Sequence, residues 1–384
     1  MSFRIDKLGV VIALIAAWGL FAAPLATSRA NRIVPGEAVA AIAALPSWAS
    51  IVLILAIVGA AAVALFVKAP TIRLLAGVGA LLALALLIGL AAGYLTPPDN
   101  TYARVSPAYG FWLLVFAFSL LAADALTRLA PPPSVRILAL VVTAIAVGAI
   151  FFSGAWDDLS ILKEYKNRAD SFRAEAGRHL VLALGSLAAA TIVGLPLGIL
   201  CHRVPRLRAA VLNVLNIIQT IPSIALFGIL IAPLAWIAAN VPGAAALGIR
   251  GIGTTPAFVA LFLYSLLPVV ANTVVGLAGV PREAEDAARG VGMTDRQRLF
   301  QVELPLAFPV ILTGIRIVLV QNIGLATIAA LIGGGGFGVF VFQGIGQTAM
   351  DLVLLGAVPT VALAFAAAVV LDAIVEMTDR TRTA

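Results

Sequence analysis

The chain has 384 residues, of which 62% are hydrophobic and 11% are charged, and its mean hydropathy is +1.09. This composition excludes a soluble globular domain and predicts an all-α polytopic membrane protein, with the lipid bilayer as its surroundings. The single cysteine, Cys201, excludes a disulfide framework and a cysteine metal cluster. We interpret the net charge of +7 as basic cytoplasmic loops and expect no nucleic-acid partner.

About ten apolar stretches are long enough to cross a bilayer. The first, 8–27, follows a short basic segment and could be a signal peptide. It is longer than a signal core and has no clear small-residue cleavage site, so we interpret it as a retained span. The other nine predicted spans are 48–67, 74–95, 109–130, 135–155, 179–200, 209–236, 257–279, 307–331 and 352–374.

The distribution of Lys and Arg predicts the topology. An even number of spans places both termini on one side, and the loops on that side carry most of the basic residues. The positive-inside rule therefore predicts cytoplasmic termini and a cytoplasmic 281–305 loop. Trp48, Trp112, Trp156 and Trp236 fall at the opposite ends of their spans, as an interfacial aromatic belt requires. The basic residues of the predicted cytoplasmic side include Arg4, Arg203, Arg206, Arg208, Arg380 and Arg382.

The chain is predicted to contain two blocks of about five spans. Residues 1–155 form an accessory membrane region with little intramembrane polarity, except for Asp124. We interpret Asp124 as a local i,i+4 ion pair with Arg128, and a proton or ion site is the alternative. The polar segment 156–178 is expected to be an external amphipathic linker. The second block covers 179–376 and is followed by a cytoplasmic tail, 377–384.

The second block contains a long polar island, 281–309, between two spans. It is predicted to form two short helices separated by Gly290 and Gly292. Thr294 and Gln297 make a capping box for the second helix, which we expect Pro305 to end. Along the first helix, a narrow face of small apolar side chains suits a shallow groove in a partner protein better than lipid. This face consists of Ala284, Ala287, Ala288 and Val291.

Within this island, the spacing of a few residues resembles a known motif. Asp286-Ala287-Ala288 is followed after three residues by Gly292, after nine more by Val302, and then by Leu304-Pro305. The pattern is similar to the EAA motif of binding-protein-dependent ABC importer permeases, with Asp for the usual Glu and Val for the usual Ile. The segments at 215–230, 256–277 and 323–345 resemble the osmoprotectant branch of that family. The resemblance covers about 200 residues and does not extend to 1–155, although some osmoprotectant permeases have extra spans there.

The resemblance implies a type I ABC importer permease core in the C-terminal half. It implies that the 281–305 loop docks in a cleft of a cytoplasmic ABC ATPase, and that a periplasmic or lipid-tethered solute-binding protein delivers the cargo. A second permease copy or a related permease would enclose the path. The chain itself would have no catalytic residue, cofactor or metal. The coupling site would consist of Ala284, Asp286, Ala287, Ala288, Gly292, Val302, Leu304 and Pro305.

Two points about the coupling site and the path stay open in the sequence. Asp286 could meet the helix dipole and an arginine of the partner, or it could be an ordinary solvated acid at a helix start. Spans six to ten are nearly free of ionisable residues except at their ends, so a weakly binding, hydrated cavity is expected. The candidates for the path or gate are Gln219, Tyr264, Asn272 and Asn322, together with Gly335 and Gly336. Polar side chains in membrane spans more often join helices through hydrogen bonds, so helix packing is the alternative for each of the four.

The two glycines belong to the run GGGGFG at 333–338. This run lacks the Lys-Ser/Thr of a phosphate-binding loop, so we interpret it as a backbone break that turns the chain back. His179 and His202 are predicted at opposite membrane ends, which excludes a shared metal ion.

From these features we expect an inner-membrane permease subunit that imports an osmoprotectant such as glycine betaine or choline. Two alternatives are an ABC permease for another small solute, such as an amino acid, and an ion-coupled secondary transporter. The scarcity of intramembrane acids and the lack of repeat symmetry argue against the secondary transporter. A membrane-embedded enzyme would need a polar catalytic cluster, and the sequence offers none.

Overall fold

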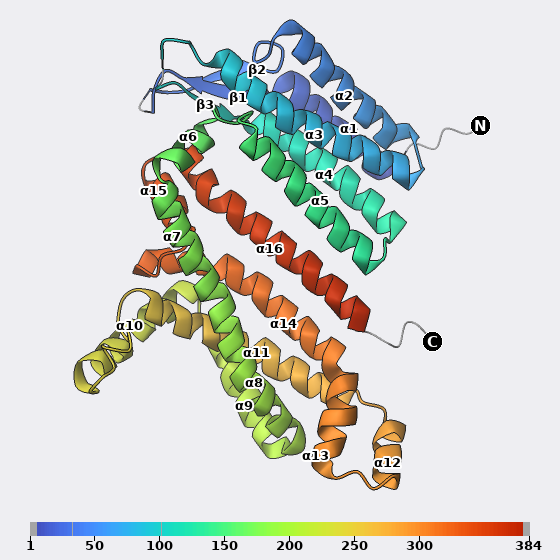
Figure 1. Cartoon of the computed structure of the whole chain (residues 1–384), viewed down its shortest axis with the longest axis vertical. Coiled ribbons are helices and arrows are strands. Elements are labelled where there is room, and N and C mark those ends of the chain that lie inside the picture. Colours follow the sequence, from blue (N-terminus) through green and yellow to red (C-terminus); the bar gives the residue numbers. More distant parts are fainter. Residues whose placement is uncertain (1–5, 33, 101, 379–384) are drawn as a thin grey trace. The chain divides into compact units, whose positions relative to one another are not determined.

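The computed structural model describes residues 6–32, 34–100 and 102–378, and the chain divides into two compact units between Asn167 and Arg168 (Figure 1). Almost all regular structure is helical, which confirms the predicted helical membrane protein. Within the described residues, nine helices are long and apolar enough to cross a membrane, and a shorter apolar helix, Lys7–Ala22, precedes them. Arg4, Arg380 and Arg382, on which the predicted side of the termini partly rests, lie outside the described residues.

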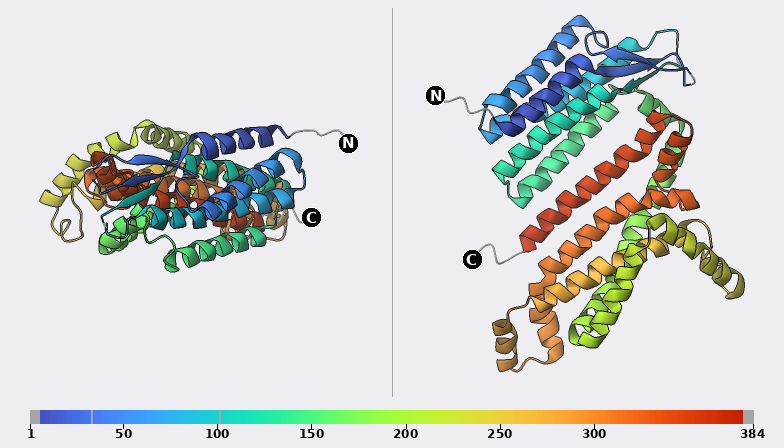
Figure 2. Two further views of the ribbon diagram at one scale, coloured as in Figure 1. Left: turned by 90° about the horizontal axis from the view of Figure 1, so that it is seen from above. Right: turned by 180° about the vertical axis from the view of Figure 1, so that it is seen from behind.

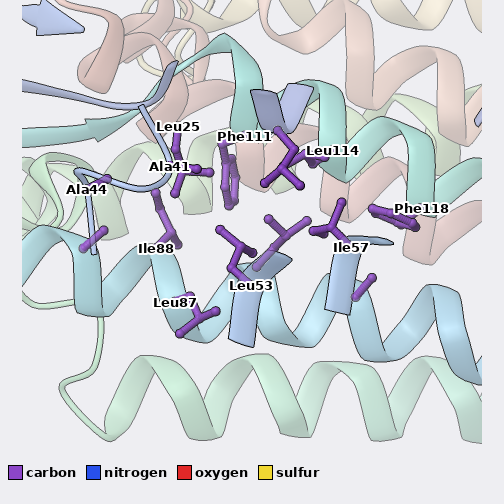
Figure 3. Packing of buried hydrophobic residues seen from close by; sticks show 14 of the residues in the cluster. Leu25, Ala41, Ala44, Leu53, Ile57, Leu87, Ile88, Phe111, Leu114 and Phe118 are labelled. Carbon is purple, nitrogen blue, oxygen red and sulfur yellow. The ribbon is translucent and has the colours of Figure 1, made fainter. Parts of the chain in front are cut away.

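The first unit is a helical bundle with an apolar core. Prolines at the starts of α3 and α5, and Pro46 just before α2, help to set these boundaries because their fixed φ suits a first helical turn. Leu53, Ile57, Leu114 and Phe118 are fully buried at its centre (Figure 3). The helices are α1 (Lys7–Ala17), continued by a π-helical turn (Trp18–Ala22), α2 (Ser47–Phe66), α3 (Pro70–Leu95), α4 (Tyr109–Leu129), α5 (Pro133–Phe152) and α6 (Ser160–Asn167).

A small antiparallel sheet, absent from our sequence prediction, covers one end of this bundle. Its strands are β1 (Pro24–Arg29), β2 (Glu37–Ala40) and β3 (Arg104–Pro107), in the order β2-β1-β3. Thr27 of β1 lies opposite both Ala38 and Ser106. The predicted first span, 8–27, is therefore too long, because the helix ends at Ala22 and the chain enters β1.

Four charged side chains join three elements at the other end of this unit. The predicted i,i+4 pair is confirmed, with Arg128 Nε at 3.0 Å from Asp124 Oδ1. Arg73 of α3 is 0% exposed and places Nη2 at 2.9 Å from Asp124 Oδ2. Asp6 accepts a hydrogen bond from the backbone N–H of Gly9, capping α1, and pairs with Arg128 at 3.0 Å. This N–H, followed by Arg128 and Arg73, lowers the pKa of Asp6 against the opposing effect of burial.

We predict that Arg73→Gln destabilises the first unit by about 1.5–3 kcal/mol, because Asp124 loses its buried partner and keeps only the half-exposed Arg128. Thermal unfolding in detergent is the measurement. Lys68→Gln, an exposed basic position in the preceding loop, is the matched control and should leave the transition where it is. Equal transitions for the two variants would contradict a structural role for the network.

The second unit begins with a long helix and continues with a break that the sequence prediction missed. The predicted span 209–236 is wrong, because Pro222 separates α9 from α10 and Ile221 is extended. The helices of this part are α7 (Ala169–Leu180), continued through a π-helical turn (Val181–Gly185) into α8 (Ser186–Arg203), then α9 (Pro205–Thr220), α10 (Ser223–Asn240) and α11 (Thr254–Ala278).

Helix α11 is the centre of the second unit and packs against both α8 and α14. Glycines make the approach to α8 possible: a Cβ on Gly198 would lie 2.5 Å from Thr273 Cβ, and one on Gly194 would lie 2.7 Å from a methyl group of Val269. This is the close packing through small residues four positions apart that is common between membrane helices.

The remaining elements of the second unit include one long helical run, with short helices before and after it in the chain. Two short helices, α12 (Arg282–Gly290) and α13 (Asp295–Arg298), precede a π-helical turn (Leu299–Glu303) and α14 (Leu304–Ala326). The run from Asp295 to Ala326 is unbroken and about 48 Å long. A 3₁₀ turn (Ile328–Ile332) and α15 (Gly338–Gly346) follow, and α16 (Met350–Thr378) lies beside α14 (Figures 1 and 2).

Candidate functional site

The loop between α11 and α14 begins with a helix that glycine ends. The backbone N–H of Met293 donates to the carbonyl of Ala288, and that of Gly292 donates to the carbonyl of Arg289. These two bonds form a Schellman motif, in which Gly292 has the required left-handed φ of 80°. A Cβ at Gly292 would meet no atom within 4 Å, so only backbone conformation makes glycine necessary there.

The second half of the loop begins as predicted but does not end as predicted. Thr294 and Gln297 form the expected capping box, with Gln297 Oε1 accepting from the Thr294 N–H at 2.9 Å. Pro305 does not end this helix, so that prediction is wrong. A π-helical turn at Leu299–Glu303 changes the hydrogen-bond register just ahead of the proline, which then fits in the first turn of α14. The loop is thereby joined rigidly to a membrane helix.

A buried ion-pair cluster holds this junction. The Glu303 side chain is 2% exposed and lies between two arginines: Arg203 Nη2 is 2.8 Å from Oε2, and Arg298 Nε is 2.7 Å from Oε1. Arg298 also pairs with the exposed Asp295 at 3.1 Å. Because Arg203 is the last residue of α8, the cluster ties α8 to the start of α14. The sequence analysis did not predict a role for Glu303. The only indication in the sequence was an acidic residue just before a predicted span, with several arginines nearby.

The motif residues are distributed over both faces of the loop. Asp286 is 72% exposed and its contact with Arg289 of the same helix is loose, at 3.6 Å. Ala287 and Val291 are exposed, whereas Ala288 is buried within the unit. The four small apolar residues therefore do not share one free face. Of the others, Ala284, Val302 and Leu304 are half-buried, and Gly292 and Pro305 are exposed.

We predict that Glu303→Gln destabilises the junction by about 3–5 kcal/mol, because Arg298 would keep its buried position without its closest carboxylate. Limited proteolysis of the 281–303 segment in the detergent-solubilised protein should become faster. Asp295→Asn is the control, since its side chain is 87% exposed and contributes little. Similar proteolysis of both variants would show that the buried pairs do not hold the loop.

Two of the candidate path residues lock the break between α9 and α10. Pro268 has no N–H to donate to the carbonyl of Tyr264 one turn earlier, and Gln219 Nε2 donates to that carbonyl instead, at 2.6 Å. In return, the Tyr264 hydroxyl donates to the carbonyl of Ile221 beside the break. The break at Pro222 and the kink at Pro268 thus each provide a hydrogen-bond donor for a carbonyl group that the other leaves free. In lipid such carbonyl groups must be bonded within the protein.

The other two candidates also bond within the helix bundle. Asn322 is fully buried, and its Nδ2 donates to Ser186 Oγ at 2.8 Å and to Ser265 Oγ at 2.9 Å, which connects α14 with α8 and α11. Asn272 donates to the carbonyl of Pro268 in its own helix and packs against Gly314. All four polar candidates therefore donate hydrogen bonds within the bundle, as residues of helix packing do, and the buried Asn322 Oδ1 is left without a hydrogen-bond partner.

The glycine run at 333–338 turns the chain at the end of α14 farthest from the loop. As predicted, it breaks the helix: Gly333, Gly335 and Gly336 have φ between 76° and 86°. Helix α7 holds the turn, since Glu175 Oε2 accepts from the Gly336 N–H at 2.7 Å and His179 Nδ1 faces the Phe337 N–H at 3.4 Å.

The structure corrects one expectation about charge. Ionisable residues in spans six to ten are not confined to the span ends, because Arg316 lies near the middle of α14. It pairs with Asp372, which lies near the C-terminal end of α16, Nη1 to Oδ1 at 2.5 Å. Arg316 is isolated in apolar sequence and Asp372 is one of several charges near the end of the chain, so neither residue alone predicted the pair. Their proximity depends on how the two helices pack.

Comparison with known proteins agrees with this architecture. Residues 194–383 match the family described as binding-protein-dependent transport system inner membrane component, and residues 6–162 match the N-terminal domain of the ABC transporter permease YehY. The osmoprotectant import permease proteins OsmW and OsmY of Salmonella typhimurium are 43% and 39% identical to this chain, over 47% and 59% of it and 79% and 87% of their own lengths.

A glycine betaine/carnitine/choline transport system permease protein, OpuCB of Bacillus subtilis, is 36% identical over 54% of this chain and 86% of its own. A chain of the methionine ABC transporter MetNI aligns over 56% of this chain and 99% of its own, at 24% identity and a TM-score of 0.47. The chain belongs to the family of inner-membrane permeases of binding-protein-dependent ABC transporters. It is a multi-pass transport subunit and not an enzyme.

Proposed function

We propose that this permease imports an osmoprotectant, such as glycine betaine or choline, that a solute-binding protein delivers. The names of its relatives carry the proposal: OsmW, OsmY and OpuCB are osmoprotectant or glycine betaine/carnitine/choline permeases at 36–43% identity. The energy comes from ATP hydrolysis in a separate cytoplasmic subunit. Both termini and the 281–305 loop face the cytoplasm in this proposal, which rests on the placement of Lys and Arg.

In this proposal the ATPase grips α12 and α13. Support comes from the exposure of Asp286, Ala287 and Val291, which leaves a small, partly apolar surface free for a groove in a partner. The buried Glu303 cluster transmits force, because it joins the loop to both α8 and α14. The motif positions Ala284, Ala288, Gly292, Val302, Leu304 and Pro305 then shape the loop and its junction with α14.

A second copy of this chain, or a related permease, completes the path in our proposal. Two helices of the second unit are little covered by the chain itself: 11% of the apolar window of α10 and 17% of that of α16 are buried, against 50% for α11. Such uncovered helices fit both lipid and a partner permease. Gly335 and Gly336 form the turn that α7 holds, and we assign them to the gate at that end of α14.

The energy source can be tested in proteoliposomes that contain the permease with its ATPase and binding protein. Uptake of labelled glycine betaine should continue when ionophores abolish all ion gradients, provided ATP is present. It should stop when a non-hydrolysable analogue replaces ATP. Uptake that ignores ATP and collapses with the gradients would instead identify an ion-coupled carrier.

The coupling role predicts a graded series at Gly292. Gly292→Val forces a β-branched residue into left-handed backbone at a cost of about 1–2 kcal/mol, and should uncouple ATP hydrolysis from uptake while membrane insertion stays normal. Gly292→Asn should be milder, since asparagine tolerates this conformation. Gly290→Ala, in open space at ordinary φ, is the control. Unchanged uptake by Gly292→Val would count against docking through this turn.

A further inference from the structure

The ion pair between Arg316 and Asp372 is the charged feature of the second unit that the coupling proposal leaves unused. Arg316 lies near the middle of α14, and Asp372 lies on the adjacent α16. The two side chains are 39% and 41% exposed in the chain, so neither is enclosed by its own helix bundle. A charge near the middle of a membrane helix, such as Arg316, is disfavoured in lipid and almost always faces water or protein. Asp372 lies in the last two turns of α16, from where its carboxylate reaches Arg316.

We propose that this pair lines the solute path and selects zwitterions over simple cations. The inference rests on the proposed function, whose solute class it narrows. In the resting state the two side chains neutralise each other. A zwitterionic quaternary amine carries both charges, so its carboxylate can take the place of Asp372 beside Arg316 while its ammonium group stays near the Asp372 carboxylate.

This exchange leaves no charge uncompensated inside the membrane. A guanidinium binds a carboxylate through two parallel hydrogen bonds, so Arg316 provides the directional contact. A quaternary ammonium has no N–H to donate, and its attraction to Asp372 is purely electrostatic. A cation that lacks a carboxylate, such as choline, could satisfy Asp372 but would leave Arg316 unpaired, which the low dielectric makes unfavourable. Arg316 is therefore the specificity-determining residue.

The helix that carries Arg316 also connects the exchange to the transport cycle. Arg316 and Glu303 lie on one continuous helical run, Asp295–Ala326, whereas Asp372 lies on a separate helix that follows the glycine turn and α15. A movement of the loop that shifts α14 along α16 opens the pair. While the two side chains are separated, the carboxylate of the solute compensates Arg316 and its ammonium group compensates Asp372.

The test compares initial uptake rates of labelled glycine betaine and labelled choline by the complete reconstituted complex. Arg316→Gln should lower the betaine-to-choline ratio about tenfold, the factor that corresponds to one lost charge-assisted hydrogen bond of about 1.4 kcal/mol. The solute selectivity of the binding protein affects all variants and wild type equally, because the same binding protein delivers the solute to each of them. A change in the ratio therefore reports on the permease. Ile317→Leu, the exposed apolar neighbour on α14, is the matched control and should leave the ratio unchanged.

Two further variants separate recognition from simple helix packing. Arg316→Lys keeps the charge and should retain most of the betaine preference, even if Arg316→Gln assembles poorly. The double variant Arg316→Gln with Asp372→Asn removes both charges; a purely structural pair predicts wild-type uptake, whereas our proposal predicts that betaine transport stays low. If the wild-type complex carries betaine and no choline, the betaine uptake rate of each variant replaces the ratio in these comparisons.

Three results would overturn the inference: an unchanged ratio in Arg316→Gln, full betaine uptake by the neutral double variant, or a wild-type complex that carries choline and no zwitterion. A wild-type complex that carries neither solute with ATP would instead refute the proposed function. The two failures are thus distinguishable.

Discussion

The membrane provides no water to bond a polar group, and this constraint explains most of the specific contacts in the chain. The carbonyl of Tyr264 that Pro268 leaves free finds Gln219, and the carbonyl of Ile221 beside the Pro222 break finds the Tyr264 hydroxyl. These two kinks thus satisfy each other's free carbonyl groups. A kink without its counterpart would leave a backbone group unbonded in a low dielectric.

Polar contacts at both ends of α14 make this helix a rigid connection between two distant ends of the second unit. At one end the Glu303 cluster fixes it to α8 and to the loop. At the other end, the glycine turn donates hydrogen bonds from its backbone N–H groups to side chains of α7. Helix α14 therefore cannot move alone: a displacement at the loop must be shared by α8 and must reach the turn. In the function proposed above, this arrangement carries a movement of the loop into the membrane helices.

Much of the candidate site was predictable because it depends on local rules. The capping box at Thr294 and the turn at Gly292 follow from hydrogen bonds between residues a few positions apart, and the glycine run breaks its helix for the same reason. The prediction failed where context overrides the local rule. Pro305 was expected to end a helix, but a π-helical turn accommodates it. Pro222, inside a long apolar stretch, did divide the predicted span.

The sequence by itself determined the class of protein, the number of apolar segments to within one or two, and the position of the long polar loop at 281–305, because composition, span length and residue spacing are properties of the linear chain. Only the tertiary structure decided which charges meet. Arg203 reaches Glu303, and Arg316 reaches Asp372, across intervals of sequence that no local pattern connects. Those pairings arise from helix packing, which small residues such as Gly194 and Gly198 permit through close approach.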